Sequence, residues 1–114
     1  MRYLVLMYQD EQVWADATSE QQQQVMAAHD AFDKAVRNQA SLVAGEALAS
    51  EGETTTLRHQ QGRPVLTDGP FAESVEQMGG FYLVDADDLD TMLALAKLLP
   101  QDYTVEIRAT VDIG

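Results

Sequence analysis

The residue best suited to proton transfer in this sequence is His29, one of only two histidines. A histidine titrates near neutral pH and acts as a general base when a hydrogen bond fixes its tautomer. His29 lies four residues after Val25 and three before Phe32, and Val36 follows after four more. These spacings place His29 on the apolar stripe of a helix. The sequence therefore predicts a histidine that faces the protein interior.

Other common chemistries have little support. The chain has no cysteine, which excludes disulfides, thiolate nucleophiles and cysteine-ligated metals. A metal site would have to draw on His29, His59, Glu46 and Asp68, but no histidine pair stands four residues apart, and His59 falls in a predicted surface hairpin. No nucleophile elbow, dinucleotide-binding motif or P-loop is present. We expect neither a metal nor another cofactor.

The net charge of the chain argues against some classes of binding partner. Nineteen acidic residues against seven Lys and Arg give a net charge of −12. Nucleic acids and anionic membranes attract basic surfaces, so neither is an expected partner. No apolar run approaches the length of a membrane span, and no secretory leader is recognisable at Met1. We expect a soluble, cytoplasmic protein.

Hydrophobic patterning predicts the elements that must position His29. Thr18 and Gln21 form a capping box that opens the helix carrying it. The residues from Gln9 to Ala17 are expected to be a polar connection in which Trp14 packs as a lid over the core or, as the alternative, lines a ligand or partner surface. A second helix starts at Asp87, buries Leu89, Met92, Leu93 and Ala96, and ends before Pro100. The strands are expected at Arg2–Tyr8, Ser41–Leu48, Thr54–His59, Arg63–Thr67, Phe81–Val84 and Tyr103–Ala109.

This order predicts one α+β domain over residues 1–114. Without the hairpin around Gln60-Gln61-Gly62, the elements read βαββαβ, the ferredoxin-like arrangement. Two helices cover only one face of such a sheet, whereas the strands Arg2–Tyr8 and Phe81–Val84 are apolar on both faces. A symmetric partner covers the second face most simply, so we predict a homodimer.

One stretch carries a family resemblance. Residues 67–73 read Thr-Asp-Gly-Pro-Phe-Ala-Glu, and residues 76–82 read Glu-Gln-Met-Gly-Gly-Phe-Tyr. Together with the first strand, Val43–Glu46 and Val105–Arg108, they resemble the DGPF-domain proteins of the YCII-related family. Val75 stands where that family usually has lysine, so a contribution of that lysine to binding an anion would be lost.

The resemblance implies a dimeric α+β barrel and a candidate catalytic pair. In the family a histidine of the first helix, matched here by His29, is proposed to pair with an aspartate. This chain has Leu99-Pro100 where the wider family often has Asp-Pro, which leaves Asp68 as the candidate partner. The alternative is a core His29 whose nitrogens are bonded to backbone and an Asp68 that only stabilises its turn.

Two functions follow as expectations. The first is a small enzyme of lyase or hydrolase type, similar to dehydrochlorinase-like family members, which binds a small organic molecule. Its pocket would be lined by Tyr8, Glu46, Phe71, Glu73 and Glu76. The second is a non-catalytic regulatory module, since DGPF-domain proteins are often implied as partners of extracytoplasmic-function sigma factors.

Overall fold

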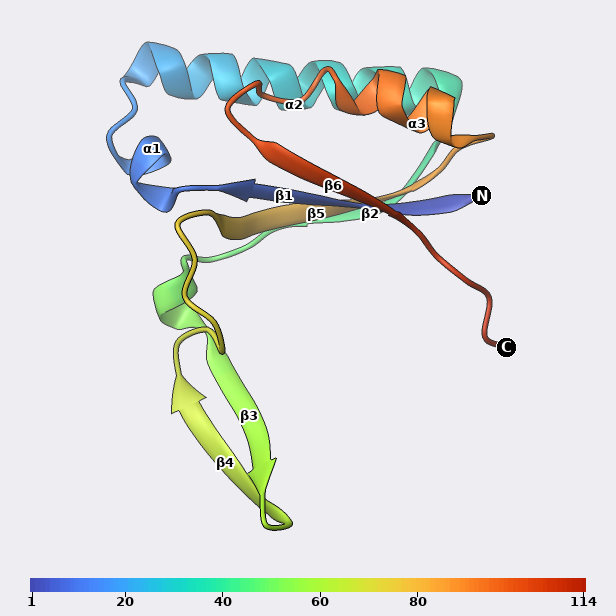
Figure 1. Cartoon of the computed structure of the whole chain (residues 1–114). Helices are drawn as coiled ribbons and strands as arrows, with labels where there is room; N and C mark the ends of the chain where they lie inside the picture. Colours follow the sequence, from blue (N-terminus) through green and yellow to red (C-terminus); the bar gives the residue numbers. More distant parts are fainter.

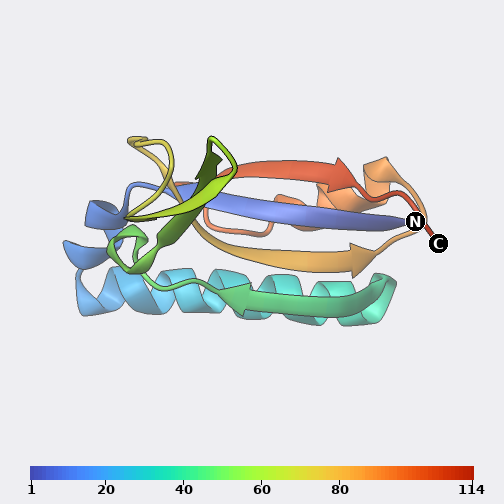
Figure 2. The same ribbon diagram turned by 90° about the horizontal axis from the view of Figure 1, so that it is seen from below.

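Four strands form one antiparallel sheet in the computed structural model, which describes residues 1–114. The strand order is β2-β5-β1-β6 (Figures 1 and 2). The strands are β1 (Arg2–Gln9), β2 (Ser41–Ala47), β5 (Gln77–Asp85) and β6 (Thr104–Ala109). The mixed α+β class is confirmed, and the element order matches the ferredoxin-like arrangement.

The side chains of the central strand β1 alternate between the two faces of the sheet. Tyr3, Val5 and Met7 are buried against the helices, while Leu4 and Leu6 face the other way and are half-buried. The alternation follows from the two-residue period of a strand. On β5, the residues opposite Leu4 and Leu6 are Leu83 and Phe81.

Helix α2 (Ser19–Gln39) begins with the predicted capping box. Thr18 Oγ1 accepts the Gln21 backbone N–H at 3.1 Å, and the Gln21 side chain accepts the Thr18 N–H at 2.8 Å. Phe32 and Val36 are fully buried beneath this helix. Figure 1 shows α2 and α3 (Leu89–Ala96) on the same face of the sheet.

Two sequence expectations were wrong in detail. Asp88, not Asp87, caps α3, because its carboxylate accepts the Thr91 backbone N–H at 2.8 Å. The buried stripe of α3 also differs: Met92 and Leu95 are buried, whereas Leu89 and Leu93 are 49% and 41% exposed. The buried residues Met92, Leu95 and Leu99 are spaced three and four residues apart, so they form one helical stripe that is offset from the predicted one.

The segment expected as a polar connection contains a short helix, α1 (Glu11–Ala15). Asp10 caps it by accepting the Gln12 backbone N–H at 2.9 Å. Trp14 lies in this helix and remains 42% exposed, so it is not a closed lid over the core.

The predicted hairpin is confirmed as β3 (Thr55–Gln60) and β4 (Arg63–Asp68), after a short 3₁₀ turn, η1 (Glu51–Glu53). Its turn places Gln61 and Gly62 at positive φ, 52° and 75°, as a two-residue hairpin loop requires. The hairpin forms a separate two-stranded sheet. It projects from the side of the main sheet that the helices leave open (Figure 1).

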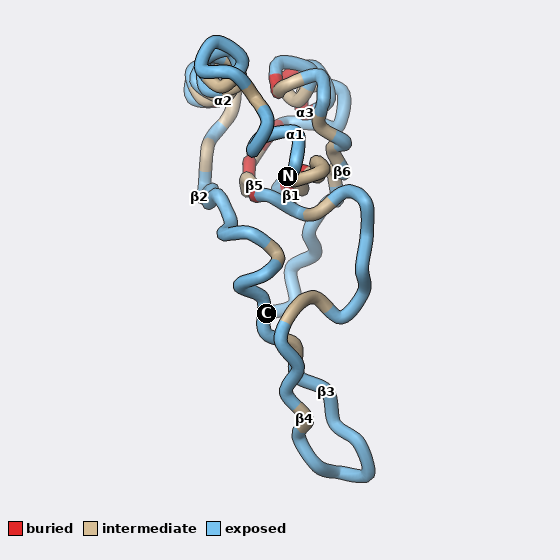
Figure 3. Tube along the Cα trace, turned by 90° about the vertical axis from the view of Figure 1, so that its left-hand side faces the viewer, coloured by how far each residue is buried: buried red, intermediate tan, exposed pale blue.

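Burial is confined to the layer between helices and sheet (Figure 3). Only 11 of 114 residues are buried, and the radius of gyration is 16.3 Å. A compact domain of this length has a radius of gyration of about 13 Å. The projecting β3–β4 hairpin extends the chain and accounts for the larger radius (Figure 1). None of the chain's helices combines the length and apolar composition needed to cross a bilayer.

Candidate functional site

His29 points from the middle of α2 toward the sheet and meets two tyrosines there. Its Nδ1 lies 2.7 Å from the Tyr82 hydroxyl on β5, and its Nε2 lies 2.9 Å from the Tyr103 hydroxyl just before β6. Both are hydrogen-bond distances. We call these three side chains the Tyr–His–Tyr array. Its partners are side-chain hydroxyls, not the backbone groups of the alternative interpretation.

The chemistry of imidazole fixes the roles within the array. A neutral imidazole has one N–H and one bare nitrogen, so one tyrosine donates its O–H and the other accepts the N–H. The accepting tyrosine keeps its own O–H free to donate elsewhere. A protonated imidazole would donate to both hydroxyls, which each hydroxyl oxygen can accept. The array can therefore store a proton without losing either hydrogen bond.

Burial sets the ionisation of the array. Burial lowers the pKa of His29 below its usual 6.5, because a charged imidazolium loses hydration there. Burial also raises the pKa of Tyr82 and of Tyr103, and the Asp33 carboxylate raises that of Tyr82 further. At neutral pH the array consequently contains an uncharged imidazole and two protonated phenols.

Two neighbours hold the Tyr82 ring in place. The Phe32 ring packs against it with centroids 4.7 Å apart. Gly45 stands opposite Tyr82 in the β2–β5 pairing, and a Cβ on Gly45 would lie 2.6 Å from Tyr82 Cδ1. The absence of a side chain at Gly45 therefore leaves the space that the Tyr82 ring occupies.

The array lies on the wall of a cavity of about 800 Å³. The cavity reaches from α2 to α1 and the adjoining ends of β1, β2 and β5, and its lining includes Tyr8, Trp14, Glu46 and Phe81. A volume of this size accommodates a small organic molecule. Tyr8 has its pKa raised, chiefly by hydrogen bonding of its hydroxyl to the Glu106 carboxylate and secondarily by burial.

Comparison with known proteins identifies the family of the chain. The model of the YCII-related domain matches residues 1–109. The chain belongs to the YCII-related family. An uncharacterised protein of Rhizobium meliloti (strain 1021) is 36% identical over 112 residues, which cover 95% of this chain and 90% of that protein. The predicted family is thereby confirmed, whereas the sigma-factor partnership and the cytoplasmic location stay predictions.

The predicted site residues of this YCII-related chain fall in two places. His29, Tyr8 and Glu46 all line the cavity, but Glu46 stands opposite Phe81 on the open face of the sheet, whereas His29 contacts Tyr82 on the face that the helices cover. Asp68 ends β4 on the hairpin and does not take part in the hydrogen bonds of the His29 ring. Glu76, nearer the main sheet, accepts a hydrogen bond from Thr104 Oγ1 at 2.8 Å.

Phe71 and Glu73 lie in the loop between β4 and β5. Phe71 is 75% exposed, and the Arg58 guanidinium lies 5.8 Å from the centre of its ring. Glu73 is exposed in the same loop. The loop residues of the motif are therefore separate from the cavity, and the strand residue Tyr82 joins it instead.

Sequence reasoning missed Tyr82, Tyr103 and Gly45 as site residues. A signal existed for Tyr82, since a hydroxyl inside the buried run Phe81–Val84 needs a hydrogen-bond partner. No pattern linked Tyr103 to His29, because the two are 74 positions apart in the chain.

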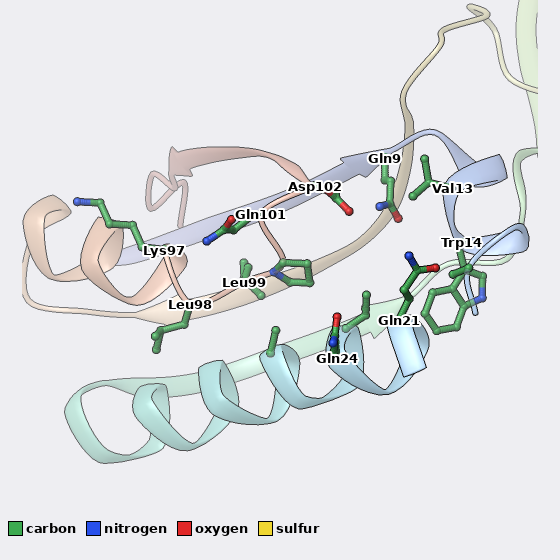
Figure 4. A pocket seen from close by; sticks show the side chains of 14 residues that line it. Gln9, Val13, Trp14, Gln21, Gln24, Lys97, Leu98, Leu99, Gln101 and Asp102 are labelled. Atoms are coloured by element: carbon green, nitrogen blue, oxygen red, sulfur yellow. The ribbon is translucent and has the colours of Figure 1, made fainter. Parts of the chain in front are cut away.

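A second hollow of about 570 Å³ lies between α2 and the turn that follows α3. The side-chain ends of Gln21, Gln24, Gln101 and Asp102 surround it (Figure 4). It contains no histidine or tyrosine to exchange a proton near neutral pH. No three His, Cys, Asp or Glu side chains of the chain are grouped to hold a metal ion. The cavity beside His29 is thus the candidate for chemistry.

Proposed function

We propose that this protein binds a small organic molecule in the cavity beside His29 and catalyses proton transfer there, as a lyase or hydrolase does. The observation that carries the proposal is the imidazole held between two phenol hydroxyls at 2.7 and 2.9 Å on the cavity wall. A general base needs a fixed tautomer and hydrogen-bond access to the substrate, directly or through one relay group.

The proton path follows from the array. A tyrosine that donates its O–H to the bare imidazole nitrogen can take a proton from the substrate as its own proton passes to His29. The resulting imidazolium donates hydrogen bonds to both hydroxyls. The other tyrosine directs its O–H at a substrate oxygen where negative charge develops. In this scheme Tyr82 and Tyr103 orient His29, the role that the resemblance assigned to an aspartate.

The test is a thermal-shift screen of metabolites on the wild type, His29→Asn and the control His59→Asn. Both substitutions remove an imidazole, but His59 is exposed on the hairpin. We expect compounds that stabilise the wild type and His59→Asn to stabilise His29→Asn less, and turnover of any substrate to be lost in His29→Asn alone. Equal responses of all three proteins would refute the proposal.

We further propose that the protein works as a homodimer, a dimeric α+β barrel in which the open sheet faces pack together. The support is the half-buried apolar residues on that face, Leu4, Leu6, Phe81 and Leu83. Facing sheets pack about 10 Å apart and bury such side chains between them.

Sedimentation equilibrium at micromolar concentration tests the dimer. We expect twice the chain mass of 12.6 kDa for the wild type. Leu6→Lys on the open face should shift the protein to monomer, whereas Leu93→Lys on the exposed side of α3 should not. A wild-type mass of one chain would overturn this proposal and leave the cavity chemistry standing.

A further inference from the structure

We propose that the β3–β4 hairpin is an arm that docks on a second copy of this chain, with Leu57 and Leu66 as its contact residues. The inference rests on the proposed homodimer and deepens it. The stacked sheets cover the open face, and each hairpin packs against the partner subunit beside that face. The apolar patch of the hairpin, its place in the fold and its charge each support this interface.

The hairpin has an exposed apolar patch. Leu57 on β3 and Leu66 on β4 stand directly opposite each other, and they are 55% and 70% exposed. Opposite residues of an antiparallel pair point to the same face, so the two leucines form one patch. A two-stranded ribbon that nothing covers is only marginally stable in water. A surface that buries the patch would therefore stabilise the hairpin together with the interface.

The place of the hairpin in the fold brings it beside a partner. β3 and β4 form a sheet of their own, which projects from the open side of the main sheet, opposite α2 and α3 (Figure 1). Each strand has six residues and spans roughly 20 Å, whereas packed sheets lie about 10 Å apart. A second copy that covers the open face must therefore lie alongside the hairpin, whose end reaches past the partner's sheet.

Charge favours a second copy as the occupant. Residues 55–67 contain two arginines, Arg58 and Arg63, and no acidic residue. Outside this segment, nineteen acidic residues stand against five Lys and Arg, so the body that the hairpin would meet is strongly acidic. Opposite charges steer two surfaces together. The strand register puts both arginines on the face opposite the leucine patch, where they can form the polar rim of the interface.

Sedimentation equilibrium of Leu66→Thr and Val65→Thr tests the apolar contact. Threonine keeps the strand propensity of β4, and Val65 is the neighbour of Leu66 that points to the other face of the hairpin. Val65→Thr is therefore the matched control. We expect Leu66→Thr to raise the dissociation constant of the dimer at least about tenfold, because a symmetric dimer loses the contact twice. Val65→Thr should change it little.

Arg63→Glu tests the charge in the same assay. We expect the dissociation constant to rise about three- to tenfold at low ionic strength and to return toward the wild-type value in about 1 M salt. Lys97→Glu, just after α3 on the helix side of the sheet, changes the net charge by the same amount and should have no such effect. Equal effects of Arg63→Glu and Lys97→Glu would refute the electrostatic part of the inference.

Hydrogen exchange reports on the hairpin directly. The amides of β3 and β4 should be protected in the wild-type dimer and exchange rapidly in the monomeric Leu6→Lys protein. Equal exchange in the two proteins, with equal dissociation constants for Leu66→Thr and Val65→Thr, would overturn the arm and leave the stacked-sheet dimer standing. A monomeric wild type would overturn the arm and the dimer together, while the metabolite screen on His29→Asn tests the cavity chemistry separately.

Discussion

Gly45→Ala should disturb the candidate site without removing any group that exchanges a proton. The new Cβ would lie 2.6 Å from Cδ1 and 3.1 Å from Cε1 of Tyr82, and 3.3 Å from the Phe81 carbonyl oxygen. Ordinary contacts begin near 3.4 Å, so the Tyr82 ring must move by most of an ångström. Its hydroxyl would then leave hydrogen-bond reach of His29 Nδ1.

The magnitude follows from three terms. Forcing extra volume into a packed site costs about 1–3 kcal/mol. Loss of the Tyr82–His29 hydrogen bond costs about 0.5–1.5 kcal/mol. Replacing glycine by alanine returns about 0.4–1 kcal/mol by restricting the unfolded chain. We therefore expect the free energy of unfolding to fall by about 0.5–4 kcal/mol.

Urea denaturation measures this loss, and an NMR titration follows the ring of His29. The matched control is Gly79→Ala, because a Cβ on Gly79 meets no atom within 4 Å. That control should be neutral or slightly stabilising. A Gly45→Ala protein as stable as the Gly79→Ala protein, with an unchanged His29 titration, would refute the account of how Tyr82 is held.

Three further outcomes are expected. Because burial lowers the pKa of His29 below 6.5, the imidazole of the unfolded chain is protonated before that of the folded chain as the pH falls, so the contribution of His29 to stability is complete above pH 6.5 and is lost as the pH falls through the lower folded pKa. The difference in urea stability between wild type and His29→Asn should therefore shrink over this pH range. A difference that does not change with pH would show that the pKa of His29 is not lowered. Tyr103→Phe should destabilise by about 1 kcal/mol in the same assay, since it leaves Nε2 without a partner, whereas Tyr3→Phe loses only a weak 3.3 Å contact with Met1 Sδ and should cost less. Thr18→Ala should cost about 1 kcal/mol through loss of the helix cap, measured by thermal unfolding, and an unchanged melting temperature would show that the capping box does not stabilise α2.

The sequence allowed the fold to be predicted well because its signals are local. The capping box at Thr18, the alternation of β1 and the turn at Gly62 each act within a few residues. The face of α3 was partly wrong because apolar residues lie on more than one side of this helix, and packing decides that Met92 and Leu95, not Leu89 and Leu93, are buried. His29 was placed toward the interior by its spacing, but its tyrosine partners depend on which strands meet beneath α2, which no local pattern specifies.

The strand order has a consequence for how this protein must be made. Both neighbours of β1 come from much later in the chain: Gln9 pairs with Gln77, and Tyr3 pairs with Ala109. At ordinary rates of synthesis, β1 waits on the order of several seconds with its backbone edges unpaired. The sheet therefore cannot close around β1 until β6 has been synthesised, and nascent chains interrupted before β6 expose an unpaired strand edge, a surface that favours aggregation.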